Sequence, residues 1–145
     1  MSEHILHAKS GTGRTVRGVA LVASDGFSAR YDLDRVRGVF SRPEHKLAGQ
    51  SFVDRVLVLD AAKGGVATAW MLREMRVRGV VPLALVLNRV NPIMVQGAVF
   101  AGFSMVSGFD VDVTRAIPHG AVVELNPEAS QLFVRVLSHP SAQAM

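Results

Sequence analysis

The sequence predicts a single α/β domain in which a β-rich shell surrounds a short parallel βαβα unit. Two continuous apolar runs, residues 55–60 and 83–87, are each followed by a loop and a stretch of helical composition. Val-rich segments with turn residues between them precede and follow this unit. A length of 145 residues is typical of one domain, so we assign residues 1–145 to a single unit.

The N-terminal part is predicted to be mainly β. Residues 15–23 (TVRGVALVA) alternate imperfectly and are rich in Val, which favours a strand. A turn is expected at 24–26 (SDG), followed by short strands at 27–31 and 39–40. Residues 42–50 (RPEHKLAGQ) contain Pro and Gly and are typical of a loop.

The middle of the chain carries the first half of the α/β unit. Residues 55–60 (RVLVLD) have no polar alternation, which is typical of a strand buried on both faces. A loop is predicted at 61–65, and a helix at 66–78, with Gly79 as its stop. Residues 83–87 (LALVL) then form a second buried strand.

A second helix is predicted from Pro92 to about Ala101. Asn91 fits the N-cap, Pro92 the first helical position and Gly102 the end. The resulting strand–helix–strand–helix order implies a parallel strand pair with a right-handed crossover. This helix is apolar on nearly all sides, so it must be covered on most of them, and a partner subunit is one source of that cover.

The C-terminal part returns to β structure. Residues 121–125 and 131–137 are predicted strands with a hairpin-like connection at 126–130. Residues 1–14 and 138–145 are predicted to be loose termini.

Composition excludes several classes of protein. The absence of Cys removes disulfides, thiolate zinc sites, Cys-ligated iron–sulfur clusters and a Cys nucleophile, and the five His lack metal-ligand spacing, so no metal site is expected in this chain. No apolar run is long enough to cross a membrane and no secretory signal is visible, so we expect a cytoplasmic protein without membrane contact. The net charge is +4 and the pI about 10.3, but the basic residues are scattered; we expect no nucleic-acid partner.

The loop between the first buried strand and the first helix is the best candidate site. Unpaired N–H groups of Gly64, Gly65, Val66 and Ala67 at a helix start suit a phosphate or carboxylate, and Lys63 adds a positive charge. Arg89 follows the neighbouring strand, whose carboxyl end lies at the same edge of a parallel sheet, so Lys63 and Arg89 are expected to share one anion site. The loop does not match the P-loop pattern, and an ordinary glycine turn is the alternative.

Two stretches together resemble the small swivel domain of the aconitase X family. The matching residues are His45, Leu47, Gly49, Ser51, Leu57-Val58-Leu59, Lys63-Gly64-Gly65, the strand at 83–87, Asn91-Pro92 and Gly97-Ala98. The likeness extends from about residue 15 to residue 136. It implies a swivelling β/β/α domain that works with a large catalytic subunit.

The resemblance also implies a reaction. The family's known reactions dehydrate phosphomevalonate or cis-3-hydroxy-L-proline, so the expected function is the small subunit of a hydro-lyase that dehydrates a small hydroxylated carboxylic acid and is inactive alone. Its iron or iron–sulfur centre would belong to the large aconitase X-type subunit, and this chain would hold no cofactor. A small anionic substrate fits the anion site expected from the loop.

The chain departs from the family pattern at one position. The family loop resembles Gly-Arg-Gly-Ser-Ser, whose first Ser is implied to be the catalytic base, and Gly65 stands in its place here. Thr68 is the nearest hydroxyl, so Thr68 or a partner residue is expected to act as the base. The alternative is a non-catalytic binding or regulatory module that lost the serine. The loop also resembles the phosphohistidine domain of phosphoenolpyruvate-utilising enzymes, but Ala69 replaces the His that this chemistry needs.

Overall fold

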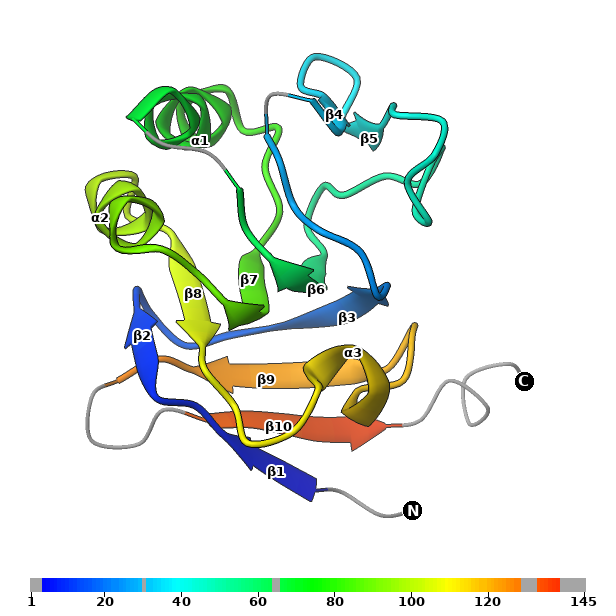
Figure 1. The fold of residues 1–145 in the computed structure, drawn as a ribbon, viewed down its shortest axis with the longest axis vertical. Coiled ribbons are helices and arrows are strands. Elements are labelled where there is room, and N and C mark those ends of the chain that lie inside the picture. The colour runs from blue at the N-terminus through cyan, green and yellow to red at the C-terminus, as the bar shows by residue number, and fades with distance from the viewer. Residues whose placement is uncertain (1–3, 30, 64–65, 129–132, 139–145) are drawn as a thin grey trace.

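A mixed β-sheet forms the centre of the protein, and two helices cover one of its faces (Figure 1). The computed structural model describes residues 4–29, 31–63, 66–128 and 133–138. The eight strands of the sheet lie in the order β1-β10-β9-β3-β6-β7-β8-β2. Their bounds are β1 His4–His7, β2 Ser10–Thr12, β3 Val16–Val22, β6 Val56–Ala61, β7 Ala84–Arg89, β8 Ser104–Ser107, β9 Val122–Asn126 and β10 Phe133–Ser138.

The predicted parallel unit is present. Strands β6 and β7 pair in parallel, with Leu57 opposite Leu85, and the crossover between them is helix α1 (Val66–Arg78). Helix α2 (Pro92–Phe100) then leads to β8, which pairs in parallel with β7, while β3 pairs in parallel with β6. Strands β9, β10 and β1 continue the sheet beyond β3 in antiparallel pairs, so the α/β class with a β-rich surround is confirmed.

Both faces of the parallel strands are buried, as their unbroken apolar sequences predict. Leu57 and Leu59 of β6 contribute to a core on the α1 and α2 side, together with Phe27 and other aromatic rings. Val56 and Val58 contribute to a second core on the opposite face, which contains residues of β9, β10 and the short helix α3 (Val113–Ala116). A period of two along each strand therefore divides its side chains between two cores.

The two long helices have the ends that their sequences predict. The bounds of α1 are those expected, and Gly79 beyond it adopts φ 77°, a left-handed conformation that glycine takes without steric cost. Asn91 caps α2 by accepting a hydrogen bond from the Met94 N–H at 2.8 Å. The same helix leaves Ile93 and Phe100 exposed, so the apolar residues predicted to need cover are only partly covered within this chain.

Several predicted elements are wrong. Residues 4–7 and 10–12 are not loose, because β1 pairs with β10 and β2 pairs with β8 through long-range hydrogen bonds that local sequence does not encode. The described residues of the predicted strand at 27–31, which are 27–29 and 31, do not form a strand, and Phe27 makes a single bridge to Ala62. Strand β8, helix α3 and the short strand β4 (Leu33–Asp34) were not predicted; β4 pairs with the expected strand β5 (Val39–Phe40). Residues 139–145 of the predicted tail lie outside the described residues, and Ser138 ends β10.

In the part of the chain that the structure describes, no helix is both long enough and apolar enough to cross a membrane.

Candidate functional site

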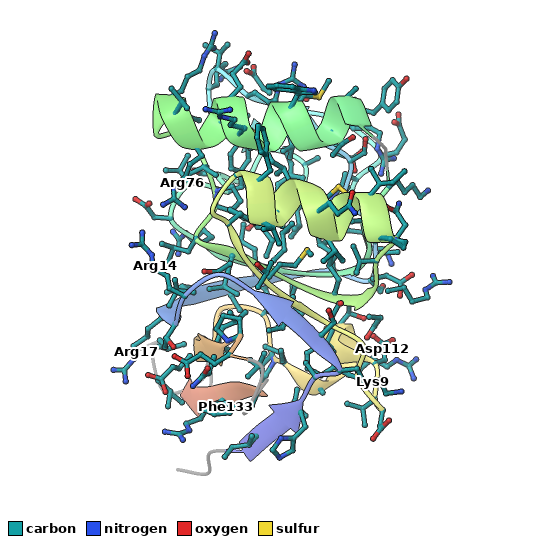
Figure 2. The ribbon with its side chains drawn as sticks, turned by 90° about the vertical axis from the view of Figure 1, so that its left-hand side faces the viewer. Lys9, Arg14, Arg17, Arg76, Asp112 and Phe133 are labelled. Atoms are coloured by element: carbon teal, nitrogen blue, oxygen red, sulfur yellow. The ribbon has the colours of Figure 1, made fainter. Side chains whose placement is uncertain are left out.

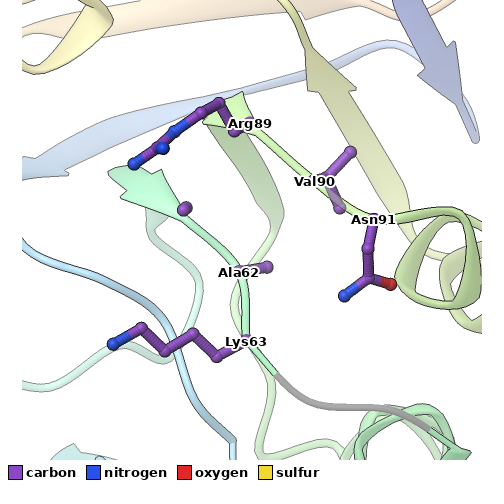
Figure 3. Close-up of a pocket in the computed structure, with 6 residues that line it drawn as sticks. Ala62, Lys63, Arg89, Val90 and Asn91 are labelled. Atoms are coloured by element: carbon purple, nitrogen blue, oxygen red, sulfur yellow. The ribbon is translucent and has the colours of Figure 1, made fainter.

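Lys63, from the predicted anion loop, lines a pocket of about 390 Å³ at the carboxyl ends of β6 and β7. The pocket is lined by Ala61, Ala62, Lys63, Arg89, Val90 and Asn91. In Figure 3 the long side chains of Lys63 and Arg89 extend to the same side, away from Val90 and Asn91. The parallel register therefore brings two cations from neighbouring strand ends to one pocket.

A short stretch of chain runs beside the loop and fixes its backbone. The Asp60 N–H donates to the Asp25 carbonyl, and the Phe27 N–H donates to the Ala61 carbonyl, each at 2.8 Å. The Lys63 N–H then donates to the Phe27 carbonyl at 2.8 Å. Residues 25–27 thus extend the sheet alongside residues 60–63 and hold the backbone of Lys63 in place.

The side chain of His45 holds residues 25–27 in place through the Gly26 carbonyl. Its side chain is fully buried, its Nδ1 accepts from the Leu47 N–H at 3.0 Å, and its Nε2 lies 2.8 Å from the Gly26 carbonyl. Because Nδ1 accepts, Nε2 carries the proton and donates to Gly26. The ring also stacks on Phe40, with 4.6 Å between the centroids. One buried side chain therefore connects the 42–50 loop to the segment that holds Lys63.

An ion-pair cluster surrounds His45. The Arg42 Nε lies 2.6 Å from Asp32, and an Arg42 terminal nitrogen lies 3.5 Å from Asp25. The second oxygen of the buried Asp32 accepts from the Ser28 N–H at 3.0 Å. Burial alone would raise the pKa of Asp25, but N–H donors from Gly26 and Lys46, with the charges beside them, outweigh it and lower that pKa.

Arg89 is already paired. One of its terminal nitrogens lies 2.7 Å from a carboxylate oxygen of Asp60, and the Asn88 amide donates to the other oxygen at 3.0 Å. The hydrogen bond from Asn88 and then that from Arg89 lower the pKa of Asp60. Asn88 also donates to Asp112, the N-cap of α3, at 2.9 Å. Arg89 thus shares its charge with Asp60, whereas Lys63 forms no ion pair with any acid in the described residues.

The remaining predicted residues are only partly described. Gly64 and Gly65 lie outside the described residues, and Val66 is the first residue of α1. Ala67 is exposed in the first turn of the helix, whereas Thr68 is only 3% exposed. The Thr68 hydroxyl therefore cannot meet a substrate outside the chain unless the start of the helix moves.

Two features of the site were missed by the sequence reasoning. Asp60 is the acid that interrupts the apolar sequence of β6 near its carboxyl end, and this position was a signal that could have marked it as a partner for Arg89. The cluster around His45 joins residues far apart in the sequence and left no local signal. No group of three or more His, Asp or Glu side chains that could hold a metal occurs in the described ranges.

The arrangement has two features that suit an anion. Lys63 supplies an exposed positive charge, and the first N–H groups of α1 have no partners within the helix. The Lys63 N–H is held by the Phe27 carbonyl, and the neighbouring Ala62 N–H donates to the Arg89 carbonyl at 3.4 Å. These bonds limit the entropy that the backbone loses when a ligand binds.

Known proteins match this chain over nearly its full length. The "Phosphomevalonate dehydratase small subunit" of Thermococcus sibiricus is 30% identical over 122 residues, which cover 84% of this chain and 92% of that protein. The protein of the same name from Methanopyrus kandleri is 31% identical over 112 residues, covering 77% and 83%. A chain in the crystal structure of Thermococcus kodakaraensis aconitase X has the same fold, with a TM-score of 0.82 at 22% identity, over 93% of this chain and 99% of that one.

A family model described as "Aconitase X swivel domain" matches residues 5–134, which confirms the resemblance inferred from the motifs. The chain belongs to the aconitase X swivel-domain family.

Proposed function

We propose that this chain is the small, swivelling subunit of an aconitase X-type hydro-lyase, which dehydrates a small hydroxylated carboxylic acid together with a large catalytic subunit. The observation that carries the proposal is the match over 92% of the length of a relative named as a small subunit. A small subunit requires a large one, and an open site with a single unpaired lysine supplies only part of what a dehydration needs.

In this proposal the chain binds and orients the substrate's anionic group. The Lys63 ammonium and the N–H groups of Gly64, Gly65, Val66 and Ala67 hold the anion, and Arg89 with its Asp60 partner lies beside it. The reaction removes a proton from one carbon and hydroxide from the next, so a double bond and water form. Closure of the swivel domain over the large subunit excludes bulk water, which strengthens the attraction between Lys63 and the substrate.

The group that removes the proton is either Thr68 or a residue of the large subunit. A threonine hydroxyl is a weak base that needs activation, and Thr68 is buried. Replacement of Thr68 by Ala separates the two assignments, because turnover by the complex falls by orders of magnitude only if Thr68 is the base. Restoring a serine with Gly65→Ser provides the matched gain-of-function variant.

The iron or iron–sulfur centre expected for the complex does not fit this chain. It has no Cys, and its described residues offer no cluster of alternative ligands. We therefore place that centre in the large subunit.

The second candidate function is a non-catalytic binding or regulatory module. The observation that favours it is Gly65, which stands where the family pattern has a serine. Under this reading the complex binds small anions through the Lys63 site, but the chain adds nothing to turnover.

The test uses this chain and the large aconitase X-type chain of the same organism, with phosphomevalonate as the first substrate. Replacing Lys63 by Ala should raise KM by about tenfold or more, because a charge-assisted hydrogen bond is lost. Lys9→Ala is the matched control, since Lys9 is exposed, pairs with Asp110 and does not line the pocket. Isolation of the chain from its native cell without a large iron-binding partner would contradict the proposal.

A further inference from the structure

An exposed apolar surface crosses the two long helices. We define the α1–α2 face by Trp70, Arg73, Val77, Ile93 and Phe100. The residues on each helix are three, four or seven apart, so they lie on one side of it. Trp70 is 59% exposed and Phe100 is 53% exposed, and their rings contact edge to face at 5.4 Å. Figure 2 shows α1 and α2 side by side on this side of the molecule, with no other element in front of them.

The residue types on the α1–α2 face are those found at the centre of protein–protein interfaces. Trp, Phe and Arg are enriched in the residues that dominate binding between proteins. The Arg73 guanidinium lies 4.8 Å from the centroid of the Phe100 ring, so the cation and the aromatic pair form one preassembled unit. Single exposed apolar residues are common, but here two exposed aromatic rings are in contact with each other. Val77 and Ile93 add further exposed apolar side chains about two turns away along the same helices.

The face begins close to the anion site along helix α1. Helix α1 begins directly after the Lys63 loop, and Trp70 lies only about 6 Å along the axis from the first residue of the helix. A protein interface of ordinary size buries about 800 Å² on each partner, which corresponds to a disc about 32 Å across. A partner that closes over Lys63 from the α1 side would therefore be large enough to contact Trp70 and its neighbouring ring, Phe100, as well.

We propose that the α1–α2 face docks on the large subunit, in an apolar pocket edged by carboxylates. This inference rests on the proposed function. The charge of the face argues for such a partner and against a second copy of the chain. Helix α1 carries Arg73, Arg76 and Arg78 with Glu74 as its only acid, so a two-fold contact would bring like charges together.

The test measures the affinity of the intact chain for the large aconitase X-type chain of the same organism. Trp70→Ala and Phe100→Ala should each weaken the complex by at least about 30-fold, the effect of a binding hot spot. Arg73→Glu should weaken the complex more at low salt than at high salt, because the effect of the substitution is partly electrostatic. The matched control is Ile5→Ala, since Ile5 is 42% exposed on β1 at the opposite end of the molecule (Figure 1).

Unfolding curves of every variant show whether the fold is kept, and Trp70→Phe should retain most of the affinity. Equal affinity of wild type and Trp70→Ala, in a complex that still turns over substrate, would overturn the docking assignment and leave the proposed function intact. Failure of the wild type to bind the large chain would overturn both. A dimer of this chain alone that Trp70→Ala dissociates would assign the face to a second copy.

Discussion

Replacing His45 should loosen the segment that holds Lys63. The ring makes two hydrogen bonds to backbone groups, one to the Gly26 carbonyl and one from the Leu47 N–H. Two variants separate these bonds. The side-chain oxygen of His45→Asn takes the place of Nδ1 and keeps the bond from Leu47, whereas the amide nitrogen of His45→Gln takes the place of Nε2 and keeps the bond to Gly26.

The cost follows from the contacts of the ring. In His45→Asn the Gly26 carbonyl loses its donor, which costs about 1–3 kcal/mol, and the stacking on Phe40 that is lost with the ring costs about 0.5–1.5 kcal/mol more. His45→Gln loses the same stacking and a different hydrogen bond, so the free energy of unfolding should fall by a similar amount in both variants.

The two variants differ in which backbone amides lose protection from hydrogen exchange. Hydrogen exchange of the Phe27 and Lys63 amides should accelerate more in His45→Asn than in His45→Gln, since only the former releases Gly26. The Leu47 amide should show the reverse order. Urea unfolding followed by fluorescence gives the total decrease in the free energy of unfolding. Amide exchange followed by NMR shows which residues lose protection. Identical exchange at Phe27 and Lys63 in the two variants would refute the idea that His45 positions the loop.

Three further predictions concern other parts of the chain. Asn91→Ala should lower the free energy of unfolding by about 1 kcal/mol, because the Met94 N–H loses its cap, and a loss below 0.3 kcal/mol by urea unfolding would contradict this estimate. Gly79→Ala should cost about 1–2 kcal/mol at the same assay, since φ 77° disfavours a Cβ, and an unchanged midpoint would refute it. Asp60→Asn should cost only about 0.2–1 kcal/mol at pH 7, because the ion pair with Arg89 is exposed. The pKa of Asp60 in the folded protein is lowered below the usual value of an aspartate by the hydrogen bonds from Asn88 and Arg89. The difference in unfolding free energy between wild type and Asp60→Asn is therefore complete above that usual pKa and decreases as the pH falls through the folded pKa; a difference that increases in acid would be contrary to the prediction.

The parallel unit was predictable because its signals are local. An apolar run such as Leu57–Val58–Leu59, a cap such as Asn91 and a stop such as Gly79 each act on residues within a few positions. The edge strands were not predictable in the same way. Strand β2 forms because Gly11 meets Val106 across the sheet, a pairing that depends on the whole fold.

The candidate site likewise has some features that the sequence predicts and others that it does not. Neighbouring strand ends bring Lys63 and Arg89 to one pocket, as the order of strands and helices predicts. The pairing of Arg89 with Asp60 and the support of the loop by His45 depend on side-chain contacts between distant segments. The substrate cannot be assigned from this chain alone if, as we propose, the large subunit completes the pocket.

The most direct test of the account is steady-state dehydration by the purified large aconitase X-type chain, measured with and without this chain. The account predicts turnover of phosphomevalonate or another small hydroxylated carboxylic acid only when both chains are present, with Lys63→Ala raising KM. Full turnover by the large chain alone, or none of these substrates dehydrated by a stable complex of both chains, would contradict it.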